Sequence, residues 1–287
     1  MIAHRPPATF QGDTFHHKVP PFPSDRVNRV NLSPYDLDPM TLTLATTTPG
    51  TPEIFASLQG EGPSLGRPST FVRLSRCNLA CEWCDTAYTW RFTGDNRFHR
   101  DDLAFERTEN QVPMEEADLA QAIAALVPDR LVITGGEPLL QGAALARMVT
   151  ALNDIRPGMH VEVETNSTVA PHPALDALVH QYNVSPKLAH SGNPASLALV
   201  PARLAAWAAE PRAFFKFVIA GKADLAEVME LQETYAIPGE RLFLMPEGRS
   251  SDVVRERSGW LADFCAAHGL RFTDRLHIHL WGDTRGT

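Results

Sequence analysis

Short apolar runs, each ending in a polar or glycine-containing cluster, recur along the chain from about residue 52 onward. In order they are STFVRLSR before the cysteines, RLVI before TGGEP, HVEV before ETNST, YNV before SPK, AFFKFVIA before GKAD, RLFL before MPEG and RLHIHL before WGDTRG. Segments with amphipathic helical spacing lie between them: PMEEADLAQAIAALV, LLQGAALARMVTALNDI, ADLAEVMELQETY and SSDVVRERSGWLADFCAAHG. Strands that alternate with helices are typical of parallel β/α units, so we predict an α/β protein with a parallel sheet.

The polar clusters all follow the predicted strands. In β/α barrels and open parallel sheets, functional groups collect at the C-terminal ends of the strands. We therefore expect TGGEP, ETN, SPK and MPEG to converge on one mouth. The cysteines follow the first of these strands and should lie at the same mouth.

The N-terminal segment differs from the rest of the chain. Residues 1–45 carry repeated prolines, scattered charges and no sustained apolar period, which predicts a disordered or extended N-terminal extension. Residues 46–287 then form the folded domain. Met40 lies near the end of the extension and is an alternative natural start.

Charge and hydropathy narrow the class of partner. The net charge of −8 argues against a nucleic-acid or anionic-membrane partner, because such proteins usually present a basic face. No apolar run approaches the roughly 20 residues that span a bilayer, and the N-terminus lacks the apolar core of a secretory signal. We therefore expect a cytoplasmic protein, in which clustered cysteines bind metal or act in catalysis instead of forming disulfides.

Three of the four cysteines lie in the segment RCNLACEWCDT, residues 76–86. Cys77, Cys81 and Cys84 are separated by three and then two residues, and thiolates bind zinc, copper(I) or iron–sulfur clusters. A four-iron cluster takes four external ligands, so three thiolates leave one iron open to a substrate or cofactor. Zinc with three cysteines and one histidine is the alternative, with His99 the nearest downstream histidine. We interpret the fourth cysteine, Cys265, as a buried core thiol in an apolar helical stretch.

The spacing Cys-x3-Cys-x2-Cys, with Trp83 just before the third cysteine, resembles the signature of the radical S-adenosylmethionine (SAM) superfamily. The segment GGEP, residues 135–138, follows a predicted strand where that superfamily places a glycine-rich contact with SAM. The resemblance implies a partial (β/α) barrel of the radical SAM type, with parallel strands and the active site at their C-terminal ends. It also implies that SAM occupies the open iron, and that residues 46–287 are the catalytic domain.

A narrower resemblance covers residue 52 to the C-terminus. QGEG, GRP, the cysteine triplet, TGGEP, ETNST, SPK and HIHLWGDTRG occur in this order, as in the 7-carboxy-7-deazaguanine synthases of queuosine and 7-deazapurine biosynthesis. The resemblance implies a lyase that converts 6-carboxy-5,6,7,8-tetrahydropterin to 7-carboxy-7-deazaguanine by ring contraction with loss of ammonia. It further implies a [4Fe–4S] cluster, SAM, Mg²⁺, a homodimer and a one-electron reductant such as flavodoxin or ferredoxin.

The resemblance also assigns roles to individual residues, with no catalytic residue beyond the cofactor ligands. Cys77, Cys81 and Cys84 bind the cluster, and the Thr86 hydroxyl binds magnesium. Substrate contacts are expected from Gln59, Gly60, Glu61, Arg67, Thr134 and His277. SAM contacts are expected from Trp83, Gly136, Glu137, Glu164, Asn166, Ser185, Lys187, Pro246 and Glu247. A guanidinium binds a carboxylate bidentately, which suits Arg67 to the carboxylate of the substrate.

Some readings stay open. Lys216 lies in mid-strand and faces either the barrel interior or an edge, and His277 and His279 share one face of a predicted strand. The long charged segment at residues 91–111 has no assigned role. The alternative functions are another radical SAM enzyme, such as a glycyl-radical activase, and a zinc-stabilised module without catalysis.

Overall fold

The computed structural model describes residues 40–287, and residues 1–39 lie outside the described part. The chain divides into the units Met1–Leu37 and Asp38–Thr287, and the fold below is that of the second unit. Most of the predicted extension at residues 1–45 therefore falls outside the described residues. Its last part does not: a strand begins at Thr41, and its Leu42 and Leu44 are fully buried. The folded domain thus begins before the predicted boundary at residue 46.

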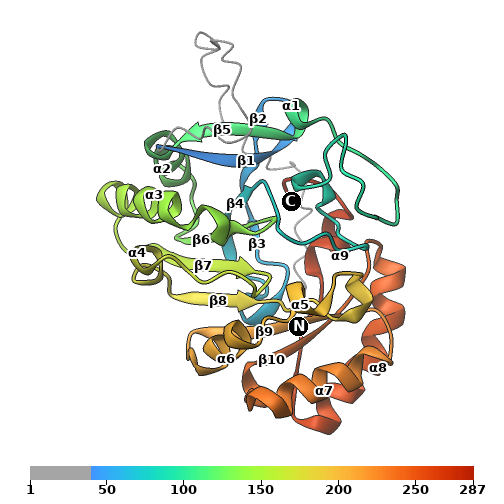
Figure 1. Cartoon of the computed structure of the whole chain (residues 1–287). Helices are drawn as coiled ribbons and strands as arrows, with labels where there is room; N and C mark the ends of the chain where they lie inside the picture. The colour runs from blue at the N-terminus through green and yellow to red at the C-terminus, as the bar shows by residue number, and fades with distance from the viewer. Residues whose placement is uncertain (1–39) are drawn as a thin grey trace, which may run out of the picture. The chain divides into compact units, whose positions relative to one another are not determined.

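A parallel sheet forms the centre of the domain (Figure 1). Its strands run in the order β4-β6-β7-β8-β9-β10-β11, and each pairs in parallel with its neighbour. Their bounds are β4 Pro68–Leu74, β6 Arg130–Gly135, β7 His160–Thr165, β8 Gln181–Val184, β9 Ala213–Ile219, β10 Leu242–Pro246 and β11 Arg271–Phe272. The sheet is not closed into a ring, which matches the predicted partial barrel. Six of the predicted runs are confirmed as parallel strands, and these strands end at residues 74, 135, 165, 184, 219 and 246.

Antiparallel strands extend the sheet beyond β4, and the sequence patterns did not reveal them. β1 (Thr41–Thr48) pairs with β4, β2 and β5, and β3 pairs with β4. Their bounds are β2 Thr51–Pro52, β3 Ile54–Leu58 and β5 Gln111–Glu115. β3 matters for the site because the segment that follows it, beginning at Gln59, folds back toward the barrel interior.

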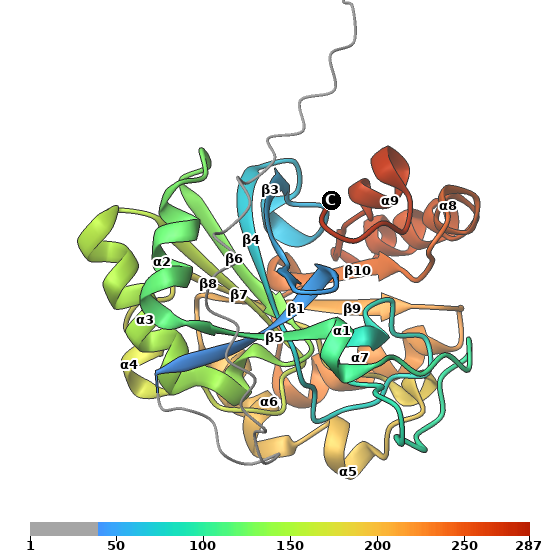
Figure 2. The ribbon, with the colours of Figure 1, turned by 90° about the horizontal axis from the view of Figure 1, so that it is seen from above.

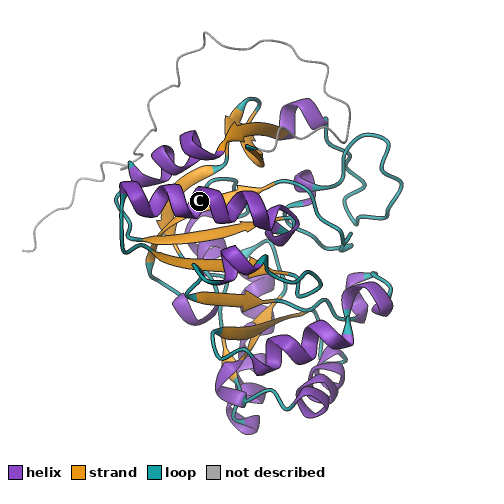
Figure 3. Ribbon diagram, turned by 60° about the vertical axis from the view of Figure 1, so that its left-hand side comes forward, coloured by secondary structure: helices purple, strands orange, loops and turns teal. Residues whose placement is uncertain are grey.

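Helices cover the outer face of the sheet (Figure 3). Figure 2 places α2 and α3 at one end of the sheet and α8 and α9 at the other. The α-helices are α1 Arg107–Asn110, α2 Glu116–Ala124, α3 Gly142–Ile155, α4 Pro173–Asp176, α5 Ala195–Ala198, α6 Pro201–Ala209, α7 Asp224–Tyr235, α8 Ser251–His268 and α9 Leu276–Trp281. Short 3₁₀ turns are η1 Gly62–Ser64, η2 Ala87–Thr89, η3 Pro138–Gln141, η4 Ala189–Ser191 and η5 Gly239–Arg241. α8 shows sequence-encoded ends: the Ser250 hydroxyl accepts a hydrogen bond from Val253 N, and Gly269 follows its last residue with φ +67°.

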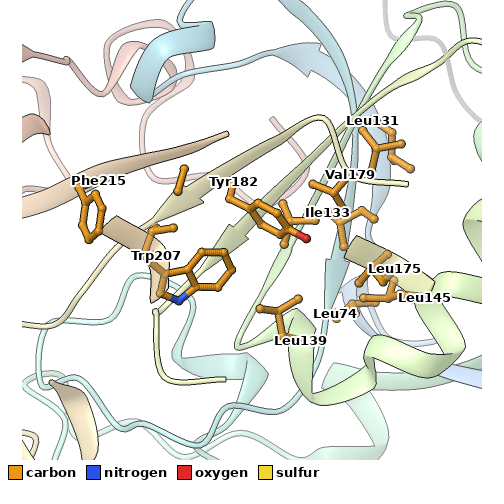
Figure 4. Close-up of a cluster of buried hydrophobic side chains, with 14 of the residues drawn as sticks. Leu74, Leu131, Ile133, Leu139, Leu145, Leu175, Val179, Tyr182, Trp207 and Phe215 are labelled. Atoms are coloured by element: carbon orange, nitrogen blue, oxygen red, sulfur yellow. The ribbon is translucent and has the colours of Figure 1, made fainter. Parts of the chain in front are cut away.

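Alternation along the parallel strands separates an apolar outer face from a polar inner face. On β7, Val161 and Val163 belong to the hydrophobic core beneath the helices, whereas Glu162 and Glu164 point to the opposite side. Figure 4 shows the outer core, where side chains of β6, β8 and β9 meet those of α3, α4 and α6. The labelled members are Leu74, Leu131, Ile133, Leu139, Leu145, Leu175, Val179, Tyr182, Trp207 and Phe215. The inner face is left free to carry polar and charged groups.

Two local predictions are wrong. The helix predicted from Pro113 begins only at Glu116, because Pro113 and Met114 pair with β1 as part of β5. The run RLHIHL is helix α9, not a strand: Leu276 N bonds the carbonyl of Gly60, which takes the chain out of the sheet after β11. Residues two apart on a helix point in different directions, so His277 and His279 do not share a face.

Among the helices of residues 40–287, none is both long enough and apolar enough to cross a membrane.

Candidate active site

A cavity opens at the C-terminal ends of the parallel strands, where the polar clusters were expected to converge. Most of the predicted site residues line it: Gln59, Gly60, Glu61, Cys77, Cys81, Trp83, Cys84, Thr86, Thr134, Gly136, Glu164, Asn166, Ser185, Lys187, Glu247 and His277. They come from segments that are far apart in sequence, which lie at or just after the ends of β3, β4, β6, β7, β8 and β10 and in α9. The predicted single mouth is therefore present.

The cysteine loop is packed directly against the Gly-Gly turn after β6. Gly136 N donates to the carbonyl of Leu74, and Glu137 N donates to the carbonyl of Arg76. A Cβ on Gly136 would lie 2.6 Å from the carbonyl carbon of Arg76 and 2.9 Å from Cys77 Cβ. Arg76 itself has φ +79°, a left-handed conformation that is costly for a residue with a Cβ. The two sequence motifs are thus one physical unit, in which glycine allows the backbone of the cysteine loop to approach.

The three thiols line the same cavity, and each has a polar neighbour. Asn193 Nδ2 lies 3.3 Å from Cys81 Sγ, and Asn166 Nδ2 lies 3.8 Å from Cys77 Sγ. Burial raises the pKa of Cys77 to about 12 and that of Cys81 to about 11, and it also raises the pKa of Cys84. A cation must therefore supply the stabilisation that turns these thiols into thiolates, and binding it releases protons.

The donor set fits an iron–sulfur cluster. It consists of three soft sulfurs on one loop, and the chain's remaining cysteine, Cys265, is buried in α8 as predicted. Within residues 40–287, no group of three or more His, Cys, Asp or Glu side chains is arranged around a point that would hold a single ion. In a cluster each thiolate binds a different iron atom, so its ligands lie farther apart than those of one ion.

Lys187 and Trp83 form the wall beside the thiols. Lys187 Nζ lies 2.8 Å from Ser185 Oγ and 5.7 Å from the centre of the Trp83 ring, and that ring stacks on His190. The buried Trp83 Nε1 has no hydrogen-bond partner in the described structure. Ser185 and Lys187 come from the SPK segment, and the wall fits a polar cofactor such as SAM.

Buried hydrogen bonds fix other side chains that line the cavity. Gln59 Nε2 donates to Glu162 Oε1 at 2.8 Å and to Glu164 Oε1 at 3.1 Å. Thr134 Oγ1 donates to Glu164 Oε2 at 2.7 Å, and Arg130 holds the fully buried Glu162 at 2.8 Å. Both N–H groups of the Gln59 amide are therefore used, and its carbonyl accepts from Glu61 N at 3.2 Å, so the amide offers the cavity one remaining carbonyl lone pair.

Charged groups form a second cluster around Glu61. Its carboxylate pairs with Lys216 and with Arg275, and Arg275 also pairs with Asp85. Burial alone would raise the pKa of Glu61, but Lys216 and Arg275 hold it well below its usual range. Burial lowers the pKa of His277, which is therefore neutral at pH 7. A Cβ on Gly60 would lie 3.0 Å from Cγ of the His277 ring, so glycine is what allows this close approach.

Three predicted residues do not reach the cavity. Arg67 is exposed and precedes β4, at the end of the parallel sheet away from the mouth. The Glu137 carboxylate is fully buried and accepts hydrogen bonds from Leu139 N, Asn166 N and the Thr165 hydroxyl, and burial raises its pKa to about 7. Pro246 is buried within β10. Glu137 is thus engaged in holding the turn after β6.

Four further charged residues line the cavity: Arg73, Asp85, Lys216 and Arg275. The direction of Arg73 could have been predicted from the sequence. It lies between the apolar Val72 and Leu74 on β4, so its side chain points to the inner face. The same rule decides the direction of Lys216. Phe215 and Phe217 pack in the outer core, so the Lys216 side chain between them faces inward. Arg275 had no local signal.

The chain resembles known proteins in sequence and in fold. The profile of the Radical SAM superfamily matches residues 72–185. The chain is 40% identical to a 7-carboxy-7-deazaguanine synthase of Pyrobaculum aerophilum over 82% of this chain and 95% of that protein. It is 36% identical to the enzyme of that name in Hyperthermus butylicus, over 79% of this chain and 90% of the relative. The crystal structure of QueE from Escherichia coli is similar with a TM-score of 0.56 and 26% identity, and covers 83% of this chain and 95% of its own.

The partial barrel with three cysteines at its mouth is that of a radical SAM protein. Within this class, the chain belongs to the 7-carboxy-7-deazaguanine synthase family, because it is 40% and 36% identical to relatives of that name over 82% and 79% of its length.

Proposed function

We propose that the enzyme is a lyase that converts 6-carboxy-5,6,7,8-tetrahydropterin to 7-carboxy-7-deazaguanine with loss of ammonia, in queuosine or 7-deazapurine biosynthesis. The observation that carries the proposal is the cavity itself. Three thiols suited to a cluster line one wall, and fixed hydrogen-bonding groups suited to a heterocycle line another. The names of the relatives support the same reaction.

Cys77, Cys81 and Cys84 are the proposed ligands of a [4Fe–4S] cluster. The wall made by Trp83 and Lys187 is the proposed SAM site, together with Gly136, Glu164, Asn166, Ser185 and Glu247, all of which line the cavity. When bound, the cluster and SAM supply the one-electron chemistry that starts the ring contraction. The chain's own part is to hold both next to the substrate and away from bulk water.

Magnesium is proposed to bind at Thr86. Thr86 lines the cavity one residue after Asp85, and its hydroxyl lies 3.5 Å from Cys84 Sγ. Hard oxygen ligands of this kind suit Mg²⁺, which keeps several waters or substrate oxygens in its shell. Asp85 contributes negative charge: burial would raise its pKa, but Arg275 lowers it, so the carboxylate is ionised.

The substrate is proposed to lie between Gln59, Glu61, Thr134 and His277. Gln59 presents an acceptor to a pterin N–H, because its own donors are used. Of the two arginines near β4, Arg73 faces the cavity, whereas Arg67 lies at the opposite end of the strand. We therefore assign the carboxylate of the substrate to Arg73 in place of Arg67.

A one-electron reductant such as flavodoxin or ferredoxin, a homodimeric assembly and a cytoplasmic location belong to the same proposal. The free cysteines of the described chain are consistent with a reducing compartment.

The proposal is tested by anaerobic reconstitution of the protein with iron and sulfide, followed by incubation with a reductant, SAM, Mg²⁺ and the carboxytetrahydropterin. Mass spectrometry should detect 7-carboxy-7-deazaguanine. SAM cleavage without this product would leave a radical SAM enzyme of other specificity, such as a glycyl-radical activase. A protein that binds zinc and no iron would place the chain outside catalysis altogether.

A further inference from the structure

Arg275 joins four segments that are distant in sequence. It lies between β11 and α9, and its guanidinium contacts Glu61 after β3 and Asp85 in the cysteine loop. It also donates to the carbonyl of Gly248 after β10, and its Nη2 lies 3.4 Å from His277 Nε2. All three guanidinium nitrogens therefore have partners, and the side chain is only 7% exposed.

The two carboxylates that Arg275 bridges belong to different parts of the proposed site. Glu61 belongs to the wall assigned to the pterin, and Asp85 is the residue between Cys84 and Thr86. Lys216 pairs with Glu61, but within residues 40–287 it forms no ion pair or hydrogen bond with Asp85. Among the described residues, Arg275 is the cation that contacts both carboxylates.

Charge balance explains why this bridge is stable when buried. Two cations, Arg275 and Lys216, pair with two carboxylates, Glu61 and Asp85, while Arg73 adds positive charge near Asp85 and Glu164 adds negative charge near Lys216. A buried charge without a partner is costly, so removing one cation leaves an uncompensated carboxylate that would repel or misplace its neighbours. The planar guanidinium can hold two carboxylates in fixed directions, which a lysine ammonium cannot do equally well.

We propose that Arg275 is a positioning residue that fixes the pterin-contacting Glu61 relative to Asp85 and the magnesium-binding Thr86. The inference rests on the proposed function and goes beyond it, because it assigns a role to a residue outside the family motifs. Arg275 acts on the substrate through Glu61. It acts on the metal by partly neutralising Asp85, so it holds the magnesium affinity below the value that the free carboxylate would give.

This role predicts two opposite changes in Arg275→Gln. The Kd of the pterin should rise by about tenfold or more, because Glu61 loses one of its two cations and its fixed direction. The Kd of a divalent cation should fall, because Asp85 loses its paired cation and more of its negative charge acts on the metal. If Arg275 only stabilised the fold, its substitution would weaken the binding of both ligands together.

The experiment uses reconstituted, cluster-loaded enzyme without a reductant, so that no turnover occurs. Pterin binding is followed by fluorescence, and Mn²⁺ binding is followed by the EPR signal of the free ion at saturating pterin. Arg212→Gln is the matched control, because Arg212 also bridges two carboxylates, Asp176 and Glu210, at 2.8 Å but does not line the cavity. The control should bind pterin and Mn²⁺ as the wild type does.

Weaker pterin binding together with tighter Mn²⁺ binding supports the inference. Unchanged binding of both, or weaker binding of both, overturns it. Arg275→Lys is the substitute if Arg275→Gln does not fold. It should weaken the binding of the pterin and change the affinity for Mn²⁺ less. A wild-type enzyme that does not bind the pterin overturns the proposed function, and this inference with it. A wild type that binds the pterin, together with an Arg275→Gln variant whose binding is unchanged, overturns this inference alone.

Discussion

Gly136→Ala tests whether the Gly-Gly turn after β6 supports the cysteine loop. The new methyl group would lie 2.6 Å from the carbonyl carbon of Arg76 and 2.9 Å from Cys77 Cβ. The Arg76 carbonyl cannot simply move away, because it accepts the Glu137 N–H at 2.9 Å. The loop that carries Cys77 must therefore shift, and overpacking of this kind costs about 1–3 kcal/mol.

This cost corresponds to a fall in Tm of roughly 2–12 °C for a domain of this size. We expect the variant to lose iron as well, because Cys77 moves relative to the other two thiols. The Tm is measured by calorimetry. The iron content and the absorbance near 400 nm are measured after reconstitution of the cluster. Gly259→Ala is the control: Gly259 lies inside α8 with nothing within 4 Å of a Cβ. That change should stabilise the protein by about 0.5–1 kcal/mol and leave the iron content unchanged. A Gly136→Ala protein with wild-type Tm and full iron content would refute the reasoning.

Three further predictions follow from the site. Cys84→Ala should abolish binding of the cluster, seen as loss of iron and of the absorbance near 400 nm, and a full cluster in this variant would exclude Cys84 as a ligand. Arg73→Gln should raise the KM for the pterin by about tenfold or more, whereas Arg67→Gln should leave it unchanged; the reverse order would restore the assignment made from the GRP motif. Lys216→Met should lower the Tm most at neutral pH. The pKa of Glu61 is held below its ordinary value of 4.5, so the pairing of its carboxylate with Lys216 stabilises the fold above pH 4.5. This stabilisation is lost as the pH falls toward the lowered pKa. The difference in Tm between wild type and variant should shrink below pH 4.5, and a constant difference from pH 3 to pH 8 would contradict this.

The parallel sheet could be predicted from the sequence because each strand carries its own signal. An apolar run followed by a polar cluster marks both the strand and its functional end, and six such runs are strands as expected. β1 and β5 gave no comparable signal, since they pair antiparallel with each other and carry no functional cluster. The proline-rich composition before residue 45 also concealed the start of β1.

The site was predictable wherever its residues belong to a local motif. The thiols, Gly136 and Lys187 are examples, and all of them line the cavity. Arg275 could not be found in this way, because its partners Asp85 and Glu61 lie 190 and 214 positions away in the chain. Only the folded chain brings these charges together.

The two histidines of RLHIHL illustrate a different limit. A period of two suits a strand, but the segment is α9 because its first residue bonds the carbonyl of Gly60. On this helix His277 lines the cavity, whereas His279 Nε2 lies 3.2 Å from Asp274 Oδ1. A tertiary contact therefore decided both the type of element and which histidine reaches the site.

The most direct test of the account is the product formed by the reduced, reconstituted enzyme with SAM, Mg²⁺ and 6-carboxy-5,6,7,8-tetrahydropterin. The account predicts 7-carboxy-7-deazaguanine and an equal amount of ammonia from the wild type, and neither from Cys84→Ala. Cleavage of SAM by the wild type without any deazaguanine would contradict it.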